Sequence, residues 1–167
     1  MDFQSGREER ADIYRFFADL FLRPPDEEMI ETLRLYFAVE AKYTPESASP
    51  DFENIFRQHP PYESMYDYYG GISPLFEVHA FYESAGLMLD EELGLPADHI
   101  GVELLFMSYL VENNRLELQR KFLEGHLLKW APQYMDKLQK AAESGFYKDM
   151  TAIIKNFLLM DYENLSE

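Results

Sequence analysis

The chain has 167 residues, of which 31 are acidic and 15 are Lys or Arg, so its formal net charge at pH 7 is −16. This balance disfavours nucleic acid and anionic membrane surfaces as partners and favours a cationic one. The absence of cysteine excludes disulfides, thiolate metal sites and cysteine nucleophiles, and an aromatic content of 16% is too high for a disordered acidic tail.

The length fits a single domain spanning residues 1–167. Residues 1–10 are mixed in charge and lack the apolar stretch of a signal peptide. No segment approaches the roughly 20 apolar residues that a membrane span needs. We therefore expect a cytoplasmic protein with no stable membrane insertion.

Two helices are predicted at the start of the chain. Apolar residues recur at three- and four-residue steps from Ile13 to Phe21, and Pro24 ends this helix because proline lacks a backbone donor. Asp26 is a good N-cap for a second helix, whose apolar stripe runs to Phe37.

Less regular structure is predicted between residues 44 and 72. Residues 44–51 are polar and contain two prolines, which favours a loop, and a short helical turn follows around Phe52 and Phe56. Residues 58–72 combine two prolines and two glycines with four tyrosines. Such a tyrosine-rich loop is expected to pack against the body of the protein.

Helical spacing returns after residue 72. Pro74 is expected to begin a helix that Gly86 ends, and Asp98 to cap the next one, which Asn113 and Asn114 interrupt.

The remaining chain is predicted to hold three further helices. One covers residues 115–130, a second opens at Pro132 and closes at Gly145, and the last surrounds residues 150–158. No segment shows the period of a strand, so the predicted fold is an all-α, single-domain bundle of about seven or more helices.

The charge is concentrated in residues 58–114, which we call the acidic block. It contains no Lys or Arg and ten acidic residues, together with three of the four histidines and many aromatic residues. The simple interpretation is an acidic, solvent-facing surface. The alternative is a binding surface for a partner that is cationic and partly apolar.

Two histidine–acid pairs in the acidic block suggest an alternative function. His79 with Glu83, and His99 with Glu103, are four residues apart, so each pair lies on one helix face and could supply two metal ligands. The Glu-x-x-His repeats of a di-iron bundle are absent. A metal-dependent helical bundle is therefore the alternative, and a histidine hydrogen-bonded to a nearby acid is the simpler explanation.

The most distinctive segment is Pro96–Gly101, which we call the hallmark string. His99 is expected in the first turn of a helix, where the helix dipole disfavours a charged imidazole. Gly101 inside a helix costs about 1 kcal/mol relative to alanine, which indicates a close approach by backbone or ligand.

Through this string and several other segments, the chain resembles the TorD/DmsD/NarJ family of cytoplasmic chaperones for molybdoenzymes. The segments that carry the resemblance are Tyr14, Phe17, Phe21 and Pro24; Pro61-Tyr62-Glu63-Ser64-Met65-Tyr66; Tyr82 and Gly86; Pro96-Ala97-Asp98-His99-Ile100-Gly101 with Glu103-Leu104 and Phe106-Met107; and Phe122, His126-Leu127 and Trp130.

The resemblance implies a TorD-like helical protein that is not an enzyme. Such a chaperone binds the twin-arginine leader, or the apo form, of a molybdopterin-dependent oxidoreductase subunit and delays its export or assembly until the cofactor is inserted. The resemblance assigns leader recognition to Asp98 and His99. Tyr62, Tyr66 and Tyr82 are added because they lie in or near the matching segments.

A twin-arginine leader also fits the composition of the acidic block. Carboxylates bind guanidinium groups bidentately, and tyrosine rings stack on them. We expect Glu63, Asp67, Asp98 and Glu103 to supply part of the charge complementarity. No cofactor is predicted, and the sequence is compatible with a monomer and with a domain-swapped dimer.

Overall fold

The computed structural model describes residues 6–39, 42–66 and 73–166. Its α-helices are α1 (Arg7–Leu22), α2 (Glu27–Phe37), α3 (Pro45–Gln58), α4 (Pro74–Ser84), α5 (Ile100–Glu112), α6 (Leu116–Phe122), α7 (Leu128–Ala141) and α8 (Gly145–Ser166). Short helical turns are η1 (Glu63–Met65), η2 (Glu91–Leu93) and the π-helical η3 (Leu123–Leu127). The described residues contain no strand, so the all-α prediction is confirmed.

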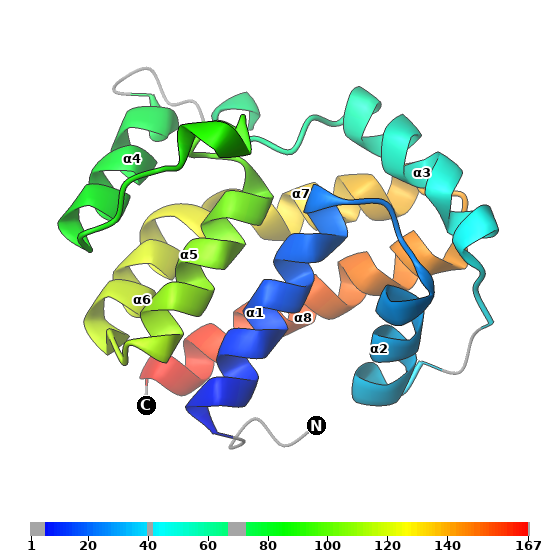
Figure 1. The fold of residues 1–167 in the computed structure, drawn as a ribbon, viewed down its shortest axis with the longest axis horizontal. Coiled ribbons are helices and arrows are strands. Elements are labelled where there is room, and N and C mark those ends of the chain that lie inside the picture. The colour runs from blue at the N-terminus through cyan, green and yellow to red at the C-terminus, as the bar shows by residue number, and fades with distance from the viewer. Residues whose placement is uncertain (1–5, 40–41, 67–72, 167) are drawn as a thin grey trace.

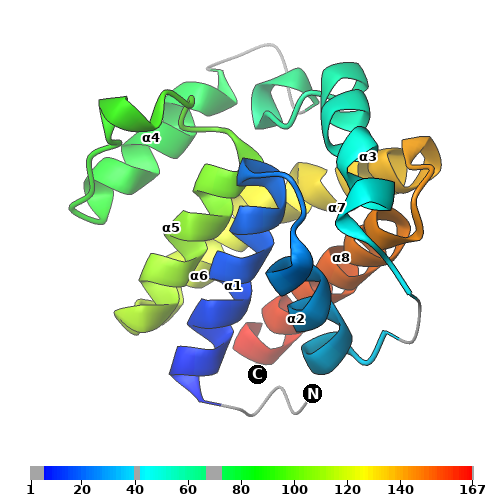
Figure 2. The ribbon, with the colours of Figure 1, turned by 45° about the vertical axis from the view of Figure 1, so that its right-hand side comes forward.

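The bundle is organised around α5. Its buried residues lie on nearly every side, including Ile100, Leu104, Met107 and Val111, as expected for a helix enclosed by others. Figures 1 and 2 show α1 beside α5, with α8 behind α1 and α7 packed against α8. None of the described helices is long and apolar enough to cross a membrane.

A polar cluster ties the two ends of the chain together inside this bundle. Asp161 of α8 accepts two hydrogen bonds of 2.8 Å from Arg10 and one of 2.6 Å from Tyr14, both on α1. Arg10 also donates to Gln119 of α6, which is fully buried. Each buried polar group in the cluster thus has a partner, which is the condition for keeping charge in a core.

The predicted helix ends near residues 22–26 and 84–86 are confirmed. The Asp26 carboxylate accepts a hydrogen bond from Met29 N at 2.9 Å, so it caps α2. Gly86 follows α4 with a φ of +83°, a conformation that glycine adopts without a steric penalty.

The predicted loop over residues 44–51 is wrong, because α3 begins there. Thr44 and Ser47 form a capping box, and Pro45 occupies the first helical position, where its missing N–H is not needed. Pro50 lies inside the helix, which is held by burial of Ala48, Asp51 and Ile55. Packing therefore overrides the composition of this segment.

The predicted boundaries at Pro132 and Gly145 are also wrong. α6, η3 and α7 form one continuous helical segment, and Pro132 lies inside α7. Burial of Trp130, Ala131 and Tyr134 on either side of the proline maintains the helix. Gly145 begins α8 rather than ending α7, which stops at Ala141.

Candidate functional site

The hallmark string connects two distant parts of the chain. The Asp98 carbonyl accepts Glu63 N at 3.0 Å, and the Asp98 carboxylate accepts Ser64 N at 2.9 Å. Ile100 N donates to the Pro61 carbonyl at 2.9 Å, and Tyr62 and His99 form an isolated antiparallel bridge. The string therefore fixes the start of the tyrosine-rich loop against α5.

The helix cap of α5 differs from the predicted one. His99, not Asp98, is the N-cap, and its Nδ1 accepts a hydrogen bond from Gly101 N at 2.9 Å. Asp98 instead binds the turn at residues 63–65, because its backbone lies one residue outside the helix. A Cβ on Gly101 would lie 2.8 Å from Leu22 Cδ2, so the close approach is made by a side chain of α1 and not by the backbone or ligand that the sequence predicted.

His99 is held as a neutral imidazole. Burial lowers its pKa from 6.5 to about 4, against a smaller opposing effect of the neighbouring Asp98 carboxylate. The direction agrees with the sequence prediction, but burial is the main cause rather than the helix dipole. Tyr62 packs edge-on against the imidazole at 5.5 Å.

A second layer of polar residues lies beneath the hallmark string. His126 Nδ1 is 2.9 Å from Glu63 Oε1, and both side chains are buried. Trp130 Nε1 donates to Glu103 Oε2 at 3.3 Å, whereas Glu103 Oε1 has no hydrogen-bond partner among the described residues. Burial, followed by the Glu63 carboxylate, raises the pKa of Glu103 well above its usual range.

Two members of this layer, His126 and Trp130, were absent from the predicted site residues. Both belong to segments that carry the family resemblance, so the signal was present in the sequence. Their roles depend on which acids they meet, and those acids lie 63 and 27 residues away. Sequence spacing alone could not pair them.

An aromatic stack extends from this layer to the surface. The half-buried Tyr66 ring lies parallel to Trp130 at 5.7 Å and contacts Tyr134 at 5.0 Å. Lys137 Nζ lies 4.8 Å from the centre of the Tyr66 ring. Tyr66 thus already makes a cation–π contact, which is the kind of contact that tyrosine rings are expected to make with an arginine of the leader.

The predicted site residues divide into buried and accessible groups. Glu63, Asp98, His99, Glu103 and Tyr82 are buried, with at most 4% of each residue exposed. As placed, the carboxylates of Glu63, Asp98 and Glu103 lie beneath the surface, and their contact with a leader stays a prediction.

The remaining predicted residues lie nearer the surface or outside the described chain. Tyr62 and Tyr66 are partly exposed, and Asp67 lies outside the described residues. Tyr82 links the two groups, because its hydroxyl donates to the Ala97 carbonyl at 2.6 Å while its ring lines a surface hollow.

That hollow belongs to a groove between α4, the following connector and α5. Hollows of about 820 Å³ and 260 Å³ share Leu87, Met88, Leu89 and Asp90, and we call them together the α4–α5 groove. Figure 1 shows this connector running back along α4 toward α5.

The groove combines an apolar floor with an acidic rim. Leu105 and Phe106 contribute to the floor, and Glu83, Asp90 and Glu91 lie along the edge. No Lys or Arg lines either hollow. The arrangement suits an extended partner that carries a cation beside apolar side chains.

The structure gives the metal alternative no support. His79 and Glu83 are 3.5 Å apart on the exposed face of α4. His99 and Glu103 are buried, and they accept hydrogen bonds from Gly101 N and Trp130 Nε1 instead of facing each other as a pair of ligands. Within residues 6–39, 42–66 and 73–166, no group of three or more histidine or acidic side chains could hold a metal ion.

Comparisons with known proteins agree on one family. The family model described as the nitrate reductase delta subunit matches residues 19–136. The chaperone protein TorD of Vibrio parahaemolyticus is 27% identical over 92% of this chain and 93% of its own length. The chaperone protein TorD of Vibrio atlanticus is 26% identical over 99% and 98% of the two chains.

A third relative matches a shorter segment more closely. A Haemophilus influenzae protein named "Probable Tat proofreading chaperone DmsD" is 41% identical over 58 residues, which cover 35% of this chain and 28% of its own.

Proposed function

The chain belongs to the nitrate reductase delta subunit family, which includes TorD-type chaperones, and from this premise we propose that it is a cytoplasmic maturation chaperone for a molybdopterin-dependent oxidoreductase. Its action is to bind the twin-arginine leader, or the apo form, of the catalytic subunit and to delay export or assembly until the cofactor is inserted. Its similar relatives are named as chaperones and not as enzymes.

The observation that carries the leader proposal is the α4–α5 groove. A twin-arginine leader joins two guanidinium groups to an apolar stretch, and the groove offers acids beside an apolar floor with no Lys or Arg in its lining. Met88 is 90% exposed at its edge, so an apolar contact is available there. Tyr82 links the hallmark string to this surface, because its hydroxyl donates to the Ala97 carbonyl while the residue lines the groove.

The test is a binding titration with a fluorescent synthetic peptide that carries two adjacent arginines and an apolar stretch of leucine and alanine. Charge reversal at the exposed Glu91 is expected to raise the Kd by about tenfold, which corresponds to about 1.4 kcal/mol. Glu53→Lys on α3 is the matched control, because Glu53 is also exposed but lies far along the chain from the groove.

Three further measurements complete the experiment. A peptide with glutamine in place of both arginines should bind weakly, and added salt should weaken the arginine peptide more strongly. Met88→Ala tests the apolar contact. Equal affinity of the Glu91→Lys and Glu53→Lys variants would reject the groove, and equal affinity for the two peptides would reject twin-arginine recognition. Asp98 and Glu103 are unsuitable for charge reversal because both are buried.

A further inference from the structure

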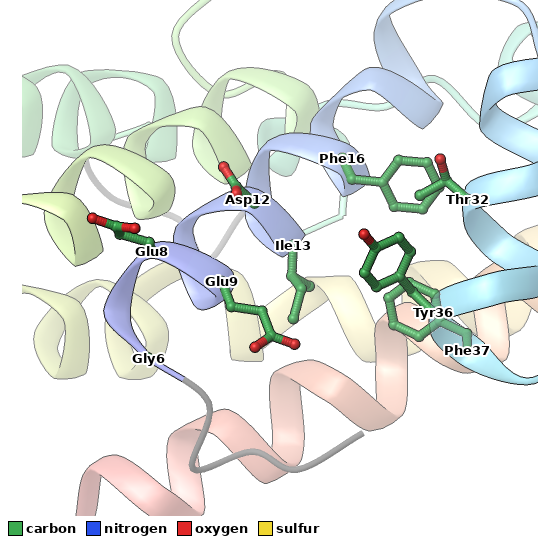
Figure 3. A pocket seen from close by; sticks show the side chains of 9 residues that line it. All are labelled: Gly6, Glu8, Glu9, Asp12, Ile13, Phe16, Thr32, Tyr36 and Phe37. Carbon is green, nitrogen blue, oxygen red and sulfur yellow. The ribbon is translucent and has the colours of Figure 1, made fainter.

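A second hollow lies on a different part of the molecule, between α1 and α2. It has a volume of about 740 Å³, and its lining includes Glu8, Glu9, Ile13, Phe16, Tyr36 and Phe37. Figure 3 shows Phe16 and Tyr36 directed toward one another across it, with Glu9 and Ile13 beside them on α1. We call this the α1–α2 hollow. None of its lining residues belongs to the acidic block.

One side of the hollow is an aromatic wall. The rings of Phe16 and Phe37 stack at 6.2 Å with an interplanar angle of 18°, and Phe37 also contacts the buried Phe17 at 5.5 Å. These contacts anchor the wall to the core, whereas Tyr36 is 57% exposed. The wall is therefore rigid at its base and accessible at its edge.

The apolar surface continues beyond this hollow toward α8. An adjoining hollow of about 250 Å³ shares Tyr36 and Phe37 and is also lined by Ile153 and Met160. Met160 is 42% exposed. The combined surface is longer than a single side chain and suits several consecutive residues of a peptide.

The charge at the open end of this surface is unbalanced. Among the described residues, neither Glu8 nor Glu9 has a hydrogen bond or ion pair from its side chain, whereas Asp12 is paired with Arg15. No Lys or Arg lines either of the two hollows. A partner that brings a guanidinium or ammonium group would meet the Glu9 carboxylate without displacing an existing Lys or Arg.

We propose that the α1–α2 hollow is a second peptide-binding surface, which takes a basic and apolar segment of a protein partner. Its arginine or lysine binds Glu9, where Glu8 adds to the local negative charge, and an adjacent aromatic or aliphatic side chain packs on Phe16, Tyr36 and Phe37. A guanidinium can also stack on the exposed Tyr36 ring. Because different elements form the α4–α5 groove, one chaperone molecule can hold two segments of a client at the same time.

The probe is an acetylated, amidated peptide of alternating arginine and phenylalanine, titrated into the isotopically labelled protein at low salt and followed by amide NMR signals. The largest shifts are expected in the first two turns of α1 and the last turn of α2. Combined Glu8→Gln and Glu9→Gln substitutions should raise the Kd about fivefold or more, which corresponds to about 1 kcal/mol. Tyr36→Ala should have a comparable effect.

Matched controls are Glu46→Gln with Glu53→Gln on α3, and Phe76→Ala on α4, all at exposed positions. Unchanged affinity of the Glu8→Gln, Glu9→Gln variant would overturn the proposal. It would also be overturned if the amide signals that the peptide shifts belonged to residues 79–109 of the protein. Sedimentation supplies a third test, because self-association that the same variant abolishes would identify a second copy as the occupant instead. Binding of the twin-arginine peptide to the Glu91→Lys variant is measured separately. The proposal for the α1–α2 hollow can therefore be rejected without rejecting the one for the α4–α5 groove, and the reverse.

Discussion

Glu103 shows how a single buried residue is adapted to this core. Its carboxyl group accepts one hydrogen bond from Trp130, leaves the other oxygen unpaired and lies close enough to Glu63 for that charge to raise its pKa. A raised pKa means that the neutral form is retained in the folded protein. In the unfolded chain the group ionises above its ordinary pKa of 4.5, so its contribution to stability is lost as the pH rises above that value.

Substitution of Glu103 should therefore have opposite effects depending on the replacement. Glu103→Gln keeps an acceptor for Trp130 and cannot ionise, so we expect its free energy of unfolding to equal or exceed that of the wild type at pH 7 and to converge toward it near pH 4. Glu103→Ala leaves a cavity and an unpaired indole N–H, and should lose about 2 kcal/mol or more. Urea denaturation at several pH values measures both; equal losses in the two variants would contradict this account.

His99 predicts the reverse pH dependence. Because its folded pKa of about 4 lies below the unfolded value of 6.5, the native protein binds fewer protons between these values and loses stability as the pH falls from 6.5 to 4. The loss reaches about 3 kcal/mol at the lower end. His99→Asn retains a favourable N-cap without a titrating ring and should flatten this part of the pH profile.

The control for His99 is the exposed His79 on α4. His79→Asn should leave the slope between pH 4 and pH 6.5 as it is in the wild type. If His99→Asn also left that slope unchanged, His99 would not be the buried neutral group that the structure shows.

At the scale of elements, a carboxylate of α3 binds the chain just before α8, beside the ring contact of Phe56 with Tyr147. Asp51 is buried on α3 and accepts hydrogen bonds from Glu143 N at 3.1 Å and Ser144 N at 2.7 Å, immediately before α8 begins. The same carboxylate therefore docks one helix and satisfies backbone donors at the start of another.

Asp51→Ala should lower the free energy of unfolding by about 2 kcal/mol, because two backbone N–H groups lose a charged acceptor that is itself buried. Asp51→Asn should lose less, since its side-chain oxygen still accepts. Denaturant midpoints at constant m-value measure the effect, with the exposed Glu53→Ala as control. An Asp51→Ala variant as stable as its control would show that the docking of α3 does not depend on this carboxylate.

Element boundaries also show the limits of prediction from sequence. Asp26 and Gly86 mark helix ends correctly because a cap and a positive φ are local requirements. Pro50 and Pro132 predicted a loop and a helix start, yet both lie inside helices. Burial of the flanking residues outweighs the lost N–H, and that burial depends on neighbours distant in sequence.

Across the whole molecule, negative charge and apolar surface coincide at two separate places. The α4–α5 groove joins acids of the acidic block to an apolar floor, and the α1–α2 hollow joins Glu8 and Glu9 to an aromatic wall. Both lack Lys and Arg in their linings. Part of the net charge of −16 thus lies at the edges of two hollows that suit basic, apolar peptides, and the charge is not spread over a uniform solvated surface.

The sequence by itself determined the helical class and the family, and it predicted a cationic partner. These follow from residue periodicity, ordered motifs and composition, which need no knowledge of distant contacts. The tertiary structure decided which acids remain accessible. Asp98 lies in the hallmark string and Glu103 two residues beyond it, yet both are buried, whereas Glu91 and Glu9 lie at open hollows. Burial depends on which helices pack together, and that packing joins residues too far apart in sequence for local patterns to pair.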